Sequence, residues 1–503
     1  MRRKSLQLST ALMLALAPAA WRADGAPPAD AGEPKSATSS SEQPPAPREA
    51  VAGSWVGTLD AGVKLRIVFN IEQSADGTFK ATLDSPDQGA KGIRIDETTF
   101  ADGELKLTSK ALRATFKGKL ANGEIAGTFT QGGTALPLAL KPAEKAPEIK
   151  RPQVPKKPYP YEEREVTVEN KPAGVKLAGT LTVPKGDKPF PAVLLISGSG
   201  PQDRDESLLG HQPFLVLADY LTRRGIAVLR LDDRGVGGSS GDLATSTTDD
   251  LAGDALAAVE FLKSCAEFDP QRIGLVGHSE GGLIAPLAAS RSDDVKFIVL
   301  IAGPGVTGEE ILYAQGELIS RAGGGGDAAT KFQRALQEKL FAIVKDFERQ
   351  AAAAPGDMPP DTTEVEKKLV AAITGLSILL PEDKRKAAEA QAQAQARSLV
   401  TPWFRYFLSY DPRPTLAKVH CPVLAVIGER DLQVPPAQNL PEIEKALKAA
   451  GNGNYTLHEL PTLNHLLQTC TTGAPSEYGQ IEETMAPSAL ALIGDWISQQ
   501  SGH

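Results

Sequence analysis

Apolar and polar side chains alternate along residues 51–140, which predicts β-strands that each bury one face. The alternating apolar positions are Leu65, Ile67, Phe69 and Ile71; Leu105 and Leu107; Leu112, Ala114 and Phe116; and Leu136, Leu138 and Leu140. Asp-Gly or Asn-Gly pairs at residues 76–77, 102–103 and 122–123 separate the runs, and glycine tolerates the positive φ of tight hairpin turns. We therefore expect about eight short strands, forming a small all-β domain, a barrel or sandwich, over residues 51–145.

Beyond residue 160 the apolar residues form continuous runs. These runs lie within residues 191–200, 225–235, 272–282, 296–305 and 420–431. Continuous runs are typical of strands covered on both faces, and helix-like stretches separate them. The alternation predicts parallel βαβ units, and hence an α/β domain over residues 161–503 with helices on both faces of its sheet.

The strand pattern stops at about residue 306 and resumes at residue 420. The segment between is rich in Ala, Glu, Gln and Lys, which favour helix. We interpret residues 306–400 as a helical cap inserted into the α/β domain. The alternative is that these helices extend the scaffold or form a dimer interface.

The N-terminal residues 1–25 have the pattern of a secretory signal peptide. Arg2, Arg3 and Lys4 precede an apolar run over residues 11–20, which then meets small residues. The run is about half of the roughly 20 residues needed to cross a bilayer, which favours cleavage over a permanent anchor. We expect a periplasmic or secreted protein with no membrane span after signal removal.

Two proline-rich segments separate the expected domains. Residues 26–50 hold six prolines and almost no large apolar side chains, so we expect a disordered spacer there. Residues 146–160 combine proline with lysine, which predicts a semi-rigid linker.

Composition narrows the class of function. The 503 residues include 54 Lys and Arg against 62 Asp and Glu, a formal net charge of −8, so nothing suggests a nucleic-acid partner. The three cysteines are too few for a disulfide scaffold or a cysteine-built zinc site.

A possible nucleophile lies in the sequence Gly277-His278-Ser279-Glu280-Gly281. A G-x-S-x-G motif alone is a weak signal. Here an apolar strand over residues 273–276 precedes it and a helix-capable stretch over residues 282–290 follows. That strand-turn-helix context predicts a nucleophile elbow with Ser279 exposed at the turn.

A serine nucleophile needs a base, and elimination among the histidines suggests one. The chain has six: His211, His278, His420, His458, His465 and His503. The chain order nucleophile, acid, histidine selects His465, in a loop after the last expected strand. Its alternative role is to cap the following helix.

The acid that would orient His465 follows the strand at residues 422–428. Asp431 fits best because it would lie at the same carboxyl edge of the sheet as Ser279. Glu429 in the same loop and Asp411 before the strand are the competing carboxylates.

Acyl transfer also requires donors aimed at the developing oxyanion. We expect the backbone N–H of Glu280 to be one and that of Ser199, with Gly200 as the alternative, to be the other. Residues 197–205 and 231–241 are glycine-rich but lack the residues of a phosphate-binding or dinucleotide-binding loop. We therefore expect no cofactor and no metal.

Several stretches together resemble the bacterial α/β-hydrolase carboxylesterases of the EstD type, which are related to serine aminopeptidases and prolyl-peptidase-like hydrolases. They are SGSGPQDRD, LRLDDRGVGGSSG, GLVGHSEGG, WFRYFLSYDP, CPVLAVIGERDLQVPP and LPTLNHLLQTCTTGAPSEYGQIEET. The resemblance spans about residues 161–498. It implies an α/β-hydrolase fold with a helical cap, the triad Ser279, Asp431 and His465, and cofactor-free ester hydrolysis. Trp403 and Phe404 are candidates for the acyl pocket, with core packing as the alternative.

The leading hypothesis is an exported serine carboxylesterase acting on small-molecule esters with small or medium acyl groups. The alternative is an amide-cleaving serine aminopeptidase or prolyl-peptidase-like enzyme, for which Glu309, Glu310 and Glu317 are candidate amine-binding carboxylates. A third hypothesis is that the β domain binds an envelope component or a glycan, with Trp55 and Phe69 as candidate contacts.

Overall fold

The computed structural model describes residues 51–60, 64–88, 90–131, 134–143, 150–353, 361–375 and 382–502. The expected signal peptide at residues 1–25 and spacer at residues 26–50 lie outside this range. The chain divides into two units, one ending at Glu148 and the other continuing to the C-terminus. Within the described residues, no helix combines the length and the apolar character needed to cross a membrane.

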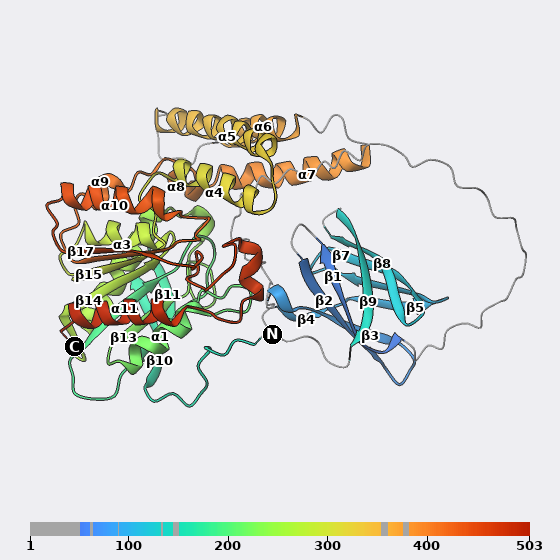
Figure 1. The fold of residues 1–503 in the computed structure, drawn as a ribbon, viewed down its shortest axis with the longest axis horizontal. Coiled ribbons are helices and arrows are strands. Elements are labelled where there is room, and N and C mark those ends of the chain that lie inside the picture. Colours follow the sequence, from blue (N-terminus) through green and yellow to red (C-terminus); the bar gives the residue numbers. More distant parts are fainter. Residues whose placement is uncertain are drawn as a thin grey trace, which may run out of the picture. The chain divides into compact units, whose positions relative to one another are not determined.

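The first unit is a nine-stranded antiparallel sheet in the order β4-β3-β2-β1-β9-β8-β7-β6-β5 (Figure 1). The strands are β1 (Gly53–Asp60), β2 (Lys64–Gln73), β3 (Phe79–Ser85), β4 (Ala90–Arg94), β5 (Glu97–Ala101), β6 (Glu104–Ser109), β7 (Ala114–Ala121), β8 (Glu124–Gln131) and β9 (Thr134–Ala143). Asp102 and Gly103, both at positive φ, turn β5 into β6, and Asn122 and Gly123 turn β7 into β8 in the same way.

The core of this unit comes from the alternating apolar positions. Leu105, Leu107, Phe116 and Leu140 are all buried in it. Trp55 and Phe69 are buried there too, at 4% and 1% exposure, so these two candidate ligand contacts belong to the core.

The second unit is built on an eight-stranded sheet in the order β10-β11-β13-β12-β14-β15-β16-β17. Its strands are β10 (Glu162–Asn170), β11 (Val175–Val183), β12 (Phe190–Ile196), β13 (Ala227–Leu231), β14 (Phe268–His278), β15 (Phe297–Ile301), β16 (Val423–Gly428) and β17 (Tyr455–Leu460). Strand β11 pairs in antiparallel fashion with both β10 and β13, and every pairing from β13 to β17 is parallel. The carboxyl ends of six neighbouring strands therefore meet at one edge of the sheet.

Helices cover both faces of this sheet (Figure 1). They are α1 (Pro213–Arg223), α2 (Thr248–Ser264), α3 (Gly281–Ala289), α9 (Arg413–Leu416), α10 (Pro436–Ala449) and α11 (Pro487–Gln500). Apolar residues of α1 and α11 belong to one core cluster, and those of α2, α3 and α10 belong to another. This two-sided arrangement, with the sheet order above, confirms the predicted α/β-hydrolase fold.

A helical insertion separates β15 from β16. It contains α4 (Gly308–Ala322), α5 (Asp327–Ala353), α6 (Thr363–Thr374), α7 (Glu382–Leu399) and α8 (Pro402–Ser409). These helices lie together beyond the sheet in Figure 1. Helix α8 lies beyond the expected end of the cap at residue 400. It starts at Pro402, which suits the first turn of a helix because a missing N–H costs nothing there.

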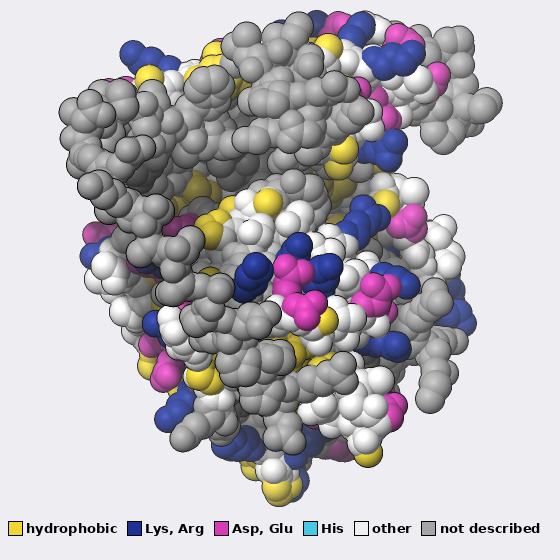
Figure 2. Space-filling view, turned by 90° about the vertical axis from the view of Figure 1, so that its right-hand side faces the viewer, with side chains coloured by type: hydrophobic (Ala, Val, Ile, Leu, Met, Phe, Trp, Pro, Cys, Tyr) yellow, Lys and Arg dark blue, Asp and Glu magenta, His cyan; other side chains and the backbone are white. Residues whose placement is uncertain are grey.

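Acidic and basic side chains are interspersed on the face of the molecule drawn in Figure 2. Among the described residues, oppositely charged side chains often pair locally, as Arg164 does with Glu162. Exposed pairs of this kind contribute little to stability, typically about 0–1 kcal/mol each, so the fold depends mainly on its apolar cores.

Candidate active site

Ser279 lies at a sharp turn between β14 and α3. Its φ is +52°, a left-handed conformation that is strained for a side chain other than glycine. A Cβ atom on Gly277 would lie 2.0 Å from the carbonyl oxygen of Gly281, and one on Gly281 would lie 2.2 Å from that of Ile196. The two motif glycines are therefore steric requirements of the turn that presents Ser279.

His465 and Asp431 contact each other across two loops. His465, after β17, has its Nδ1 2.8 Å from Oδ2 of Asp431, after β16, and both side chains are buried. The other oxygen of Asp431 accepts the backbone N–H groups of Gln433 and Val434, each at 2.8 Å. Asp431, held in this way, can accept a hydrogen from Nδ1 of His465, so that Nε2 is the ring nitrogen available to act as a base.

The competing carboxylates have other partners. Glu429 accepts the backbone N–H of Thr462 at 2.7 Å, and Asp411 pairs with Arg413 at 2.7 Å. Asp431 is thus the carboxylate that the structure brings to His465.

The loop of His465 lies against the turn that carries Ser279. The residue before the serine, His278, donates from Nε2 to the backbone oxygen of His465 at 3.1 Å. The two imidazole rings are 4.9 Å apart between centroids. By contrast, His211 is buried elsewhere, 3.0 Å from Thr484 and 2.9 Å from the carbonyl of Tyr478.

The loop after β12 approaches Ser279 from the other side. A Cβ atom on Gly198 would lie 3.2 Å from Cβ of Ser279, so this backbone runs directly past the serine. The expected oxyanion donors, Ser199 and Glu280, both line the cavity that opens here, as does Gly200. Glu280 is also the residue before the first turn of α3, where the positive end of the helix dipole lies.

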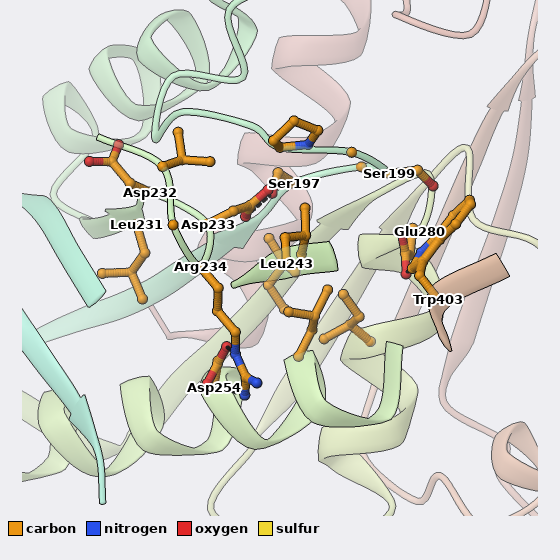
Figure 3. A pocket seen from close by; sticks show the side chains of 18 of the residues that line it. Ser197, Ser199, Leu231, Asp232, Asp233, Arg234, Leu243, Asp254, Glu280 and Trp403 are labelled. Atoms are coloured by element: carbon orange, nitrogen blue, oxygen red, sulfur yellow. Dashed lines mark hydrogen bonds and ion pairs between the residues drawn. The ribbon is translucent and has the colours of Figure 1, made fainter. Parts of the chain in front are cut away.

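The cavity has a volume of about 390 Å³ and runs from the loop after β12 toward α2 (Figure 3). Its apolar lining residues are Leu177, Leu194, Leu195, Ile196, Leu231, Val236, Leu243, Leu251 and Ile284. Ser398, Thr401 and Trp403 of the helical insertion complete the wall. Arg234 also lines it, but its guanidinium is paired with Asp254 at 2.6 Å.

Two carboxyl groups face this cavity, the buried Glu280 and the half-buried Asp233. Burial raises the pKa of Glu280, although Thr248 and Trp403 donate hydrogen bonds to its Oε1 at 2.6 and 2.7 Å. Burial also raises the pKa of Asp233 to about 8, against the opposing effect of hydrogen bonds from the Gln202 N–H and the Ser197 hydroxyl. In both cases the loss of hydration disfavours the charged form of the carboxyl group.

The two aromatic candidates for the pocket have different surroundings. Trp403 lines the cavity, and its ring stacks on Phe407 with centroids 5.2 Å apart. Phe404 is fully buried inside the helical insertion, with its ring centroid 6.1 Å from that of Phe341.

Sequence reasoning missed three residues that contact the site: Glu206, Asp233 and Thr248. Their only sequence signal was that Glu206 and Asp233 each follow a predicted strand, which is a weak indication. In the part of the chain that the structure describes, no group of three or more His, Cys, Asp or Glu side chains is placed to hold a metal ion.

Comparison with known proteins places these features in context. The profile of the X-Pro dipeptidyl-peptidase (S15) family matches residues 173–459. Esterase EstD of Thermotoga maritima is 34% identical over 62% of this chain, which confirms the predicted resemblance, but the chain spans only 61% of that protein. An uncharacterised 31.7 kDa Escherichia coli protein is 24% identical over 56% of this chain and 86% of its own length. The solved structure of a Pyrococcus furiosus esterase aligns over 71% of this chain and over the whole of the esterase chain. The two sequences are 17% identical, and the TM-score is 0.40.

Proposed function

The chain belongs to the X-Pro dipeptidyl-peptidase (S15) family, and from this premise we propose that it is a serine hydrolase that cleaves carboxylic esters of small or medium acyl groups. The contact that carries the proposal is the 2.8 Å hydrogen bond between His465 and Asp431 in a loop that is bonded to the Ser279 turn. It supplies an oriented base beside a strained, presented serine, which is the arrangement that acyl transfer requires.

In the proposed mechanism, Ser279 Oγ attacks the ester carbonyl while His465 Nε2 takes the hydroxyl proton. Asp431 keeps the imidazole in the correct tautomer and stabilises its charged form. The backbone N–H groups of Glu280 and Ser199 stabilise the oxyanion, each typically by about 10²- to 10³-fold in rate. The C–O bond to the alcohol then breaks, His465 returns the proton to the leaving oxygen, and water releases the acid by the same two steps.

The acyl group would occupy the cavity of about 390 Å³. The volume and the mainly aliphatic wall suit a small or medium acyl chain. The helical insertion then acts as a cap, since Ser398, Thr401 and Trp403 close one side of this cavity.

Cleavage of peptide amides is the second candidate, because the family is one of X-Pro dipeptidyl-peptidases. The amine-binding carboxylates expected from the sequence have other partners: Glu309 contacts Lys345, Glu310 contacts Arg413, and Glu317 contacts Arg321. Glu280 and Asp233, whose carboxyls line the cavity, are therefore the better candidates to meet a substrate amine.

We also propose that the protein is exported to the periplasm or secreted, on the basis of its N-terminal sequence. An envelope or glycan ligand of the β domain remains a proposal. It would have to bind outside the aromatic core formed by Trp55 and Phe69.

The test is Ser279→Ala, assayed with p-nitrophenyl acetate and butyrate beside aminoacyl and X-Pro p-nitroanilides. We expect wild-type protein to cleave the esters faster, and the variant to lose at least about 10⁴-fold in kcat while keeping its circular dichroism spectrum. Ser264→Ala, at an exposed serine of α2, is the matched control. Unchanged turnover by Ser279→Ala would reject the triad, and faster anilide cleavage by wild type would favour the peptidase.

A further inference from the structure

A buried pair next to the nucleophile, Glu206 and His278, has no role in the proposed triad. Nδ1 of His278 lies 2.8 Å from Oε1 of Glu206, and Nε2 lies 3.1 Å from the carbonyl oxygen of His465. A carbonyl oxygen only accepts hydrogen bonds, so Nε2 must carry a hydrogen. A carboxylate at Glu206 likewise only accepts, and paired with it Nδ1 carries a hydrogen as well, so that both ring nitrogens donate as in an imidazolium.

The surroundings of His278 favour this charged form. Burial alone would lower the pKa of His278, but the charge and hydrogen bond of Glu206 together raise it above its ordinary value. Asp431 adds a smaller attraction from the loop after β16. His465 is the ring that faces His278 from the loop after β17.

The backbone around Glu206 is shaped to aim its carboxylate. Its φ is +52°, a conformation that costs a residue with a side chain of the order of 1–2 kcal/mol. Asp203 stabilises the turn by accepting the backbone N–H groups of Asp205 and Ser207 at 3.1 and 3.0 Å. The same Glu206 oxygen that meets His278 also accepts the Gly198 N–H at 2.7 Å.

One carboxylate therefore connects three parts of the site. Through Gly198 it holds the loop that carries the expected oxyanion donor Ser199, and through His278 it holds the serine turn. His278 in turn holds the backbone of His465. We propose that Glu206 keeps His278 as an imidazolium, and that this ion pair is a positioning device that sets the oxyanion loop and His465 relative to Ser279. The catalytic half of this inference rests on the proposed esterase function.

The charge state can be measured without any catalysis. In ¹⁵N-histidine-labelled protein, we expect both ring nitrogens of His278 to show the imidazolium signature at pH 7, where an ordinary histidine is mostly neutral. The signals are assigned by their loss in His278→Gln, or by elimination with variants of the other five histidines. A neutral ring with one bare nitrogen at pH 7 would overturn the ion pair, whether or not the protein hydrolyses esters.

The positioning role is tested by Glu206→Gln, His278→Gln and the double variant. We expect each single variant to lose about 10- to 100-fold in kcat for p-nitrophenyl butyrate with KM changed less than about twofold, since misplacement by a fraction of an ångström affects the transition state most. The double variant should lose no more than the worse single variant, because the two residues act as one unit. Glu477→Gln is the matched control, because Glu477 also fixes a loop, through the N–H groups of Thr472 and Gly473.

These experiments distinguish a failure of the proposed positioning role from a failure of the proposed esterase function. Wild-type kcat in folded Glu206→Gln, or additive losses in the double variant, would overturn the positioning role. An inactive wild type would reject the esterase function while the NMR result still decides the ion pair. If Glu206→Gln does not fold, Glu206→Asp provides the kinetic comparison, because its carboxylate is one methylene shorter and is drawn back from both partners of the Glu206 oxygen.

Discussion

The pKa of Asp233 leads to a prediction that can be worked out in magnitude. This side chain faces the cavity, and burial raises its pKa from 3.8 to about 8. In the unfolded chain the group has its ordinary pKa. Asp233→Asn removes the titration while keeping the geometry: its carbonyl can accept the Gln202 N–H, and its amide can donate to the Ser197 hydroxyl.

Proton binding by Asp233 determines whether rising pH stabilises or destabilises the folded protein. Between about pH 4 and pH 8 the folded state keeps the Asp233 proton and the unfolded state has lost it, so rising pH favours unfolding. The slope is about 1.4 kcal/mol per pH unit, or about 2 kcal/mol between pH 6 and pH 7.5. The asparagine variant cannot titrate at this position, so it does not lose this stability as the pH rises. Its free energy of unfolding relative to wild type should therefore rise by about 2 kcal/mol over the same interval.

The assay is urea unfolding of both proteins at pH 6 and pH 7.5. Unfolding is monitored by the fluorescence of the tryptophans in the second unit, Trp403 and Trp496. Titrations of all other groups cancel in the difference between the two proteins. Asp269→Asn is the control, because the pKa of Asp269 is lowered and this group is ionised in both states over the interval. A difference that stays constant with pH would refute the reasoning, because it would mean that Asp233 is already ionised in the folded protein.

The same ionisation should affect catalysis. A negative Asp233 in the cavity would repel the developing oxyanion. Repulsion between like charges raises the barrier, and every increase of about 1.4 kcal/mol lowers the rate tenfold. We expect kcat/KM of wild type to fall with a midpoint near pH 8, and this fall to be absent in Asp233→Asn.

Three further substitutions have expected outcomes. Gly277→Ala places a Cβ 2.0 Å from the Gly281 oxygen, so it should abolish esterase activity and lower the melting temperature; a stable, active variant would contradict the geometry of the turn. Trp403→Phe removes a 2.7 Å hydrogen bond to buried Glu280 and should cost about 1–3 kcal/mol in urea unfolding, whereas a neutral result would mean that water replaces the indole. Phe116→Ala should destabilise the β domain by about 3–5 kcal/mol without changing kcat/KM, and a parallel loss of activity would show that the two units are coupled.

Much of the fold was readable from local sequence. The Asn122-Gly123 pair predicted a hairpin, and both residues adopt the positive φ that such a turn needs. The run before Ser279 predicted a buried strand, and β14 ends at His278. These features depend on steric and hydrophobic preferences of residues only a few positions apart, which is why periodicity and glycine placement reveal them.

The sequence by itself thus determined the two kinds of domain, the serine turn and the order of its expected partners. Only the tertiary structure decided that Asp431, and neither Glu429 nor Asp411, meets His465. It alone also brought Glu206 to His278 across 72 positions of the chain. The physical reason is that a carboxylate's partner, burial and pKa depend on which groups surround it in space. Residues far apart in the chain supply those groups, and no local pattern encodes which of them will meet.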